Sequence, residues 1–189
     1  MTRRKRRVPA AAVAAAVICS ALVISGFFGY RVFRRETHPI KYSEYVEHYS
    51  REYGIDKYFA YAVIKTESGF RPEARSDVGA RGLMQIMEQT FDWLKFRQGD
   101  ENTSYSDMYD PETNIRYGCY LLGFLMDEFG CEETAAAAYH AGRGQVNEWL
   151  SDEAISADGV HLDTIPIRDT AHYVHKVTKA KAVYVSLYG

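Results

Sequence analysis

Apolar residues recur every three to four positions along most of the chain beyond its N-terminal quarter, which is the spacing of one helix face. Three helices are expected in the first part of this region. The first is capped by Ser43 and stopped by Gly54, the second covers residues 57–68 after a cap at Asp56, and the third covers the run 83–96. A polar loop with glycines is expected between the second helix and the third.

The second half of the chain shows the same pattern with clearer helix ends. A long helix is expected from Asp110, with Pro111 in its first turn and Gly130 as its left-handed stop. Three further helices are expected over residues 133–139, 145–150 and 168–188. Because no segment alternates with a period of two for more than a few residues, the sequence predicts a mainly α fold with a single domain.

The N-terminal region differs, because its run from Val8 to Tyr30 is apolar or small throughout and carries no charge. A run of this length can cross a hydrocarbon core of ~30 Å as a helix. Five basic residues precede it, which favours a cytoplasmic N-terminus and an exported body. A cleaved signal peptide is the alternative. The expected parts are a basic cytoplasmic tail (1–7), a transmembrane anchor (8–30), a tether (31–41) and an exported domain (42–189).

Charge is distributed unevenly between these parts. The chain has 23 Lys and Arg and 25 Asp and Glu residues, and eight of the basic residues but none of the acidic ones lie before Glu36. The remaining body is acidic and lacks the basic surface that nucleic-acid binding requires, so nucleic acids are excluded as partners. No cluster of Cys and His has zinc spacing, and the sequence indicates neither a metal nor an organic cofactor.

Among the carboxylates, Glu67 has a distinctive position. It lies at the C-terminal end of the second predicted helix and is followed by Ser68, so it faces the next loop rather than the core. A single Glu at a helix end is usually solvated, and this position alone is weak evidence for catalysis. Its significance depends on the segments that follow.

Two glycine-bounded turns and one tyrosine follow Glu67. The turn over residues 76–85 lets the backbone approach a ligand closely, and Gln85, at the expected start of the third helix, can hydrogen-bond a neutral ligand such as a sugar amide. The second turn places Tyr139 at a helix end, and Tyr173 lies on the last helix. A buried tyrosine usually finds a partner for its hydroxyl, so one or both can hold Glu67. The alternatives are a solvated loop and plain core packing.

Together these segments resemble the soluble lytic transglycosylase family, whose members have a goose-type-lysozyme-like fold. The resemblance covers about residues 42–188. Its four ordered motifs are Glu67-Ser68-Gly69-Phe70, Ser76-x-x-Gly79-x-x-Gly82-Leu83-Met84-Gln85, Ala138-Tyr139-His140-Ala141-Gly142, and Ile165-Pro166 leading to Tyr173-Val174. The third motif departs from the family's usual Ala-Tyr-Asn-Ala-Gly, because His140 stands in place of Asn.

The resemblance implies a bacterial cell-wall enzyme with Glu67 as its catalytic carboxylate and no cofactor. The implied substrate-binding residues are Ser68, Ser76, Met84, Gln85, Tyr139, His140 and Tyr173. The implied reaction cuts the β-1,4 bond between N-acetylmuramic acid and N-acetylglucosamine in peptidoglycan glycan strands without water and leaves 1,6-anhydromuramic acid ends. The uncharged run 8–30 and its basic flank add an expected location in the bacterial cell membrane, as a single-pass protein with the catalytic domain on the extracytoplasmic side. A goose-type lysozyme and a non-catalytic peptidoglycan-binding module are the alternatives.

Overall fold

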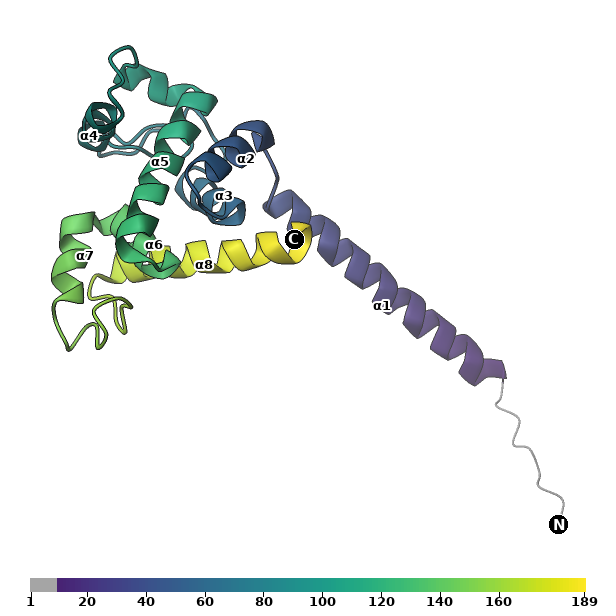
Figure 1. Ribbon diagram of the computed structural model, residues 1–189. Helices are drawn as coiled ribbons and strands as arrows, with labels where there is room; N and C mark the ends of the chain where they lie inside the picture. The colour runs from purple at the N-terminus through teal and green to yellow at the C-terminus, as the bar shows by residue number, and fades with distance from the viewer. Residues whose placement is uncertain (1–9) are drawn as a thin grey trace. The chain divides into compact units, whose positions relative to one another are not determined.

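The computed structural model describes the backbone of residues 10–189 and the side chains from Ile18 onward. The chain divides into two units, an N-terminal one that ends at Pro39 and a compact one over Ile40–Gly189. Figure 1 labels the helices of both units.

The described part of the N-terminal unit is dominated by one helix, α1 (Ala10–Thr37), so most of the predicted tether is helical. Large apolar side chains such as Leu22, Ile24 and Phe28 are exposed on it. Among the residues that the structure describes, no helix combines the length and the apolar character that a membrane crossing requires. The predicted basic tail (1–7) and the first residues of the predicted anchor lie outside the described part of the chain. The predicted anchor is therefore not confirmed.

The compact unit is built from helices. In chain order they are α2 (Ser43–Glu52), α3 (Lys57–Glu67), α4 (Glu88–Gln98), the 3₁₀ helix η1 (Tyr105–Tyr109), α5 (Pro111–Phe129), α6 (Glu132–Ala141), α7 (Arg143–Leu150) and α8 (Arg168–Tyr188). Between residues 10 and 189 the β contacts outside named strands are two isolated bridges at Arg81, and the element order contains no strand. The predicted mainly α class is confirmed.

The helix α3 lies at the centre of this unit because its residues from Phe59 to Ile64 are all buried. It packs against α8 and α2, whereas α6 packs against α5 and α8. Figure 1 shows the long α8 running past α6 towards α3. The rings of Tyr61 and Tyr184 stack with centroids 5.5 Å apart and join α3 to α8. This packing fixes the position of the C-terminal end of α3.

Most of the helix ends follow the local signals of the sequence. The Asp56 carboxylate accepts a hydrogen bond from the Tyr58 amide at 2.7 Å, and Gly130 ends α5 in the left-handed region at φ +65°. The predicted cap at Ser43 is wrong, because Ser43 is the first helical residue of α2. Tyr42 precedes it in a left-handed conformation and makes no side-chain cap.

The predicted helix over residues 83–96 is wrong at its start, over residues 83–87. The helix α4 begins only at Glu88, and Leu83, Met84 and Ile86 are buried in an irregular loop. Gly82 and Gln85 have left-handed backbones at φ +78° and +49°, which a right-handed helix cannot include. The periodic apolar residues of this segment therefore reflect burial, and the loop brings them to the end of α3.

Candidate active site

Glu67 is the last residue of α3. The helix ends at Ser68, and the next two residues, Gly69 and Phe70, both have left-handed backbones at φ +60° and +66°. The left-handed region is unfavourable for a bulky residue, and here the Phe70 ring is only 4% exposed and is anchored in the core. This reversal of the chain ends α3 abruptly and leaves Glu67 half-buried at its end.

Burial raises the pKa of Glu67 from 4.5 to about 7. A nearby Tyr173 hydroxyl opposes this rise in part, because a donor stabilises the carboxylate. That hydroxyl is buried and makes no regular hydrogen bond with any described residue, so its interaction with Glu67 is a weak one in this arrangement. Burial and then the Glu67 charge raise the pKa values of Tyr139 and Tyr173 well above 10. The structure thus brings Glu67, Tyr139 and Tyr173 together.

The Tyr139 hydroxyl does not hold Glu67 directly. It donates to the backbone carbonyl of Met84 at 2.7 Å and so connects the end of α6 to the loop before α4. The Ser68 hydroxyl donates to the Leu83 carbonyl at 2.7 Å and connects the end of α3 to the same loop. Two of the predicted binding residues therefore position the loop beside Glu67.

Ser68 and Met84 are not at the surface. Ser68 is 2% exposed and Met84 is fully buried. The Met84 side chain lies so close to Gly118 of α5 that a Cβ added at Gly118 would collide with the Met84 sulfur. A direct contact of either side chain with a glycan would require the core to open, and their role in the observed geometry is to hold the site together.

Asn114, in the first turn of α5, is a site-positioning residue that the sequence reading missed. Its side-chain oxygen accepts from the Met84 amide at 2.7 Å, and its side-chain nitrogen donates to the carbonyls of Arg81 and Met108 at 3.0 and 2.8 Å. It is fully buried. The available signal was a polar residue next to Ile115 at the start of the apolar seam of this helix.

Two polar side chains of the loop between α3 and α4 form hydrogen bonds with the backbone of that same loop. The Gln85 side-chain nitrogen donates to the carbonyls of Ala74 and Gly82 at 3.1 and 2.9 Å. The Ser76 hydroxyl accepts from the Ala80 amide at 2.9 Å. Both side chains are half-buried, and both contribute to the shape of the turn.

His140 follows Tyr139 at the end of α6 and is largely exposed. Its ring packs on that of Tyr173 with centroids 4.6 Å apart, and its Nδ1 lies 3.1 Å from the Thr170 hydroxyl of α8. Desolvation of the ring lowers the pKa of His140, which favours the neutral imidazole at neutral pH. His140 therefore lies beside the tyrosine that approaches Glu67.

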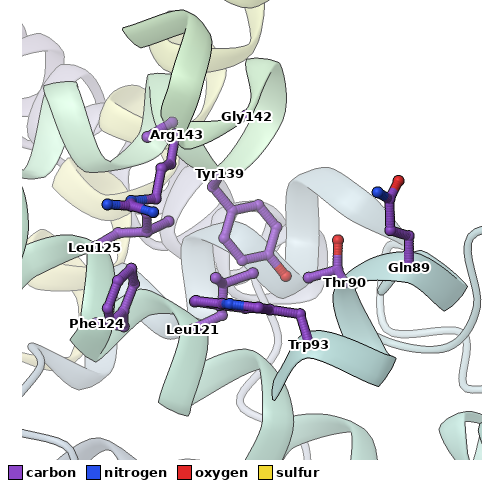
Figure 2. Close-up of a pocket in the computed structure, with 10 residues that line it drawn as sticks. Gln89, Thr90, Trp93, Leu121, Phe124, Leu125, Tyr139, Gly142 and Arg143 are labelled. Carbon is purple, nitrogen blue, oxygen red and sulfur yellow. The ribbon is translucent and has the colours of Figure 1, made fainter. Parts of the chain in front are cut away.

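A cavity of about 290 Å³ is lined by Tyr139 together with side chains of α4 and α5. Figure 2 shows Tyr139 pointing between Thr90 and Trp93 of α4 and Leu121 of α5. The Trp93 and Phe124 rings meet edge to face at 5.0 Å and form an aromatic wall. These two aromatic residues were missed by the sequence reading, because their half-buried state depends on how α4 and α5 meet.

The arrangement is suited to proton transfer. A carboxyl whose pKa is about 7 is present in both protonation states at neutral pH, so Glu67 can give a proton and take one back. In the described part of the chain, no group of three or more His, Cys, Asp or Glu side chains is placed to hold a metal ion.

The helical fold and the partly buried acid at the end of α3 define a lysozyme-like domain. The family model described as the transglycosylase SLT domain matches residues 44–160, and the chain belongs to this family. The soluble lytic murein transglycosylase of Salmonella typhimurium is 35% identical over 152 residues, which are 79% of this chain and 24% of that protein.

Two solved structures show the same fold. The lytic transglycosylase Slt of Pseudomonas aeruginosa, an inactive mutant, is 30% identical with a TM-score of 0.70, over 79% of this chain and 24% of the other. The 70 kDa soluble lytic transglycosylase of Escherichia coli is 30% identical with a TM-score of 0.74, over 82% of this chain and 26% of the other. This chain thus spans about a quarter of the length of these relatives.

Proposed function

We propose that this protein is a peptidoglycan lytic transglycosylase. It cleaves the β-1,4 bond between N-acetylmuramic acid and N-acetylglucosamine and leaves a 1,6-anhydromuramic acid end. The proposal rests on the family and on one observation, the partly buried Glu67 carboxyl whose pKa is raised to about 7 beside two tyrosines. No cofactor takes part in the proposed reaction.

The proposed reaction has two steps, and Glu67 acts in both. The protonated carboxyl first gives its proton to the glycosidic oxygen, and the bond from that oxygen to C1 of muramic acid breaks. The N-acetyl group of the same sugar stabilises the positive charge at C1. The Glu67 carboxylate then removes the proton from O6, and O6 forms the new bond to C1. Atoms balance without water, and the carboxyl ends protonated for the next turnover.

Product analysis distinguishes this reaction from hydrolysis. Purified peptidoglycan strands are incubated with the enzyme, and the released fragments are measured by mass spectrometry. The proposal expects anhydromuramic ends, which are lighter than reducing ends by one water molecule. Reducing muramic acid ends would instead identify a goose-type lysozyme, and binding without release of fragments would identify a non-catalytic module.

Substitution of the acid tests the assignment of Glu67. The Glu67→Gln variant keeps the shape of the side chain but cannot carry the proton, and its turnover should fall by at least the ~10²–10⁴-fold that general acid–base catalysis supplies. A wild-type level of turnover in this variant would place the catalytic acid elsewhere.

The stability of this variant provides the control for folding. The folded-state pKa of Glu67 lies above its unfolded value of 4.5, so ionisation of the Glu67 carboxyl disfavours the folded state. The stability that the protonated carboxyl contributes is fully present below pH 4.5 and is lost as the pH rises through about 7. Glu67→Gln removes this loss and should be more stable than the wild type at pH 8, by at most ~3 kcal/mol. The difference should vanish near pH 4. Urea unfolding at both pH values measures it.

We also propose that the chain is attached to the bacterial cell membrane by its N-terminal segment, with the catalytic domain on the extracytoplasmic side. The support is the uncharged run over residues 8–30 and the five basic residues before it. A substrate outside the cytoplasm agrees with this orientation.

A further inference from the structure

The third sequence motif carries His140 where the family usually has asparagine, and this side chain joins α6 to α8. The imidazole ring lies on the Tyr173 ring, with centroids 4.6 Å apart and planes inclined by 32°. Its Nδ1 is 3.1 Å from the Thr170 hydroxyl. Because Thr170 and Tyr173 are three residues apart, they lie on the same face of α8. One side chain at the end of α6 therefore contacts two neighbouring side chains of α8.

Both partners of His140 are buried, although His140 itself is largely exposed. Thr170 is 1% exposed, and its buried hydroxyl needs a partner, which the His140 nitrogen supplies. Tyr173 is 7% exposed, and His140 and Tyr173 together line a cavity of about 570 Å³. A ring contact at 4.6 Å excludes water from the face of the tyrosine ring that it covers. His140 thus separates part of the Tyr173 ring from solvent.

The position of Tyr173 depends on such packing contacts. Its hydroxyl is buried and makes no regular hydrogen bond with any described residue, so no strong polar contact fixes the end of the side chain. The hydroxyl nevertheless lies close enough to Glu67 to lower the pKa of that carboxyl in part. Loss of water around the carboxyl is the larger effect and raises the pKa of Glu67 to about 7. Tyr173 is one of the groups that take the place of this water.

We propose that His140 is a positioning residue, whose ring holds Tyr173 in place so that Tyr173 keeps water away from Glu67. This inference rests on the proposed function, because it concerns the acid of that reaction. Asparagine could supply a hydrogen bond to Thr170 but no ring face for Tyr173. Desolvation lowers the pKa of His140, and Asp169 opposes this in part, so the ring is mostly uncharged at neutral pH.

Other titratable groups surround this contact. From α6, Tyr139 lies near the Glu67 charge. Four charged or titratable residues of α8 line the cavity that His140 and Tyr173 share, namely Arg168, Asp169, His172 and Lys176. A substitution of His140 leaves all of them in the chain. A change in the proton affinity of Glu67 in such a variant therefore follows from the loss of the His140 contacts.

The pH profile of kcat/KM on purified strands tests the proposal. In His140→Ala, water should reach Glu67, and the alkaline limb should move to lower pH by about 0.5–1.5 units as the pKa of Glu67 falls towards 4.5. At pH 8 the rate should then fall by about 3- to 30-fold relative to the wild type. His140→Phe keeps a ring and should restore the wild-type profile. His140→Asn keeps a hydrogen-bonding group without a ring and should behave like His140→Ala.

The matched control is His175→Ala, which removes an exposed histidine of α8 outside the cavity lining. It should leave the pH profile unchanged. An alkaline limb that stays in place or moves to higher pH in His140→Ala overturns the proposal. So does a wild-type profile in His140→Asn, or a profile in His140→Phe that matches His140→Ala.

A measurement without substrate separates this inference from the proposed function. The stability gained by adding Glu67→Gln should grow as the pH rises from 4.5 and level off above the folded-state pKa of Glu67. This levelling should occur at a lower pH in the His140→Ala background than in the wild type. If strands yield no anhydro ends but this difference appears, the proposed function fails and the positioning role of His140 stands. The same levelling pH in both backgrounds overturns the positioning role.

Discussion

Glu67 has the same carboxyl group as the other glutamates of the chain, and its surroundings alone set it apart. Burial raises its pKa to about 7, whereas an ion pair and hydrogen bonds with Arg143 and Asn147 lower the pKa of Glu128. An acid that must begin protonated benefits from the first environment and would be disabled by the second. At the scale of the residue, function therefore depends on the removal of water from one carboxyl.

This difference predicts a pH dependence of activity. Because Glu67 must carry its proton to start the reaction, kcat/KM should fall as the pH rises through about 7, by roughly tenfold per unit beyond it. The measurement is the rate of fragment release at low strand concentration from pH 5 to pH 9. An activity that stays level up to pH 9 would contradict the role of Glu67 as the proton donor.

A second prediction concerns the tyrosine next to Glu67. The Tyr173 hydroxyl lowers the pKa of Glu67 in part, so Tyr173→Phe should raise that pKa and move the alkaline limb of the pH profile to higher pH. The hydroxyl makes no regular hydrogen bond, and its removal should cost less than ~0.5 kcal/mol of stability. The control is Tyr58→Phe, which removes a distant hydroxyl that donates to the Tyr188 carbonyl at 2.6 Å. If the alkaline limb of the pH profile moved to lower pH in Tyr173→Phe, the Tyr173 hydroxyl would stabilise the protonated form of Glu67 instead.

At the scale of elements, the important unit is the irregular loop between α3 and α4. Three side chains from three helices bond to its backbone: Ser68 at the end of α3, Asn114 in α5 and Tyr139 in α6. Gly82 allows the close approach, because a Cβ there would collide with the Met108 carbonyl and the Asn114 side chain. The loop thus connects the helices that carry the site.

This arrangement predicts a large effect at a residue that touches no substrate. Asn114→Ala leaves the Met84 amide and two carbonyls without their partner, and unfolding free energy should fall by ~2–3 kcal/mol. Asn102→Ala, at an exposed position, is the control and should change stability by less than ~0.5 kcal/mol. Chemical denaturation of both variants measures the difference. Equal midpoints for the two would mean that the loop does not depend on Asn114.

At the scale of the whole molecule, the chain combines a compact unit that carries the candidate active site with an N-terminal unit. We expect the intact protein in the membrane fraction of bacterial cells, with residues after Arg35 accessible to protease from outside the inner membrane. A variant that lacks residues 8–30 is the control and should leave that fraction. Recovery of a soluble mature form that begins near Phe27 would show that the segment is a cleaved signal instead.

The sequence by itself determined those features that depend on a few neighbouring residues. The Asp56 cap and the Gly130 stop act within one helical turn, and the structure has both helix ends where the sequence predicts them. The family was also recognisable from sequence, because its motifs are short and ordered around Glu67. Local signals failed at residues 83–87, where an apolar period of helical spacing belongs to a buried loop.

Only the tertiary structure decided what the side chains of those motifs do. Asn114 bonds to a backbone thirty residues away and Tyr139 to one 55 residues away, and no local pattern specifies such pairs. The same packing buries Met84, raises the pKa of Glu67 and forms two cavities, one lined by Tyr139 and the other by Tyr173. Burial and desolvation are properties of the assembled helices, because they depend on which surfaces meet in space.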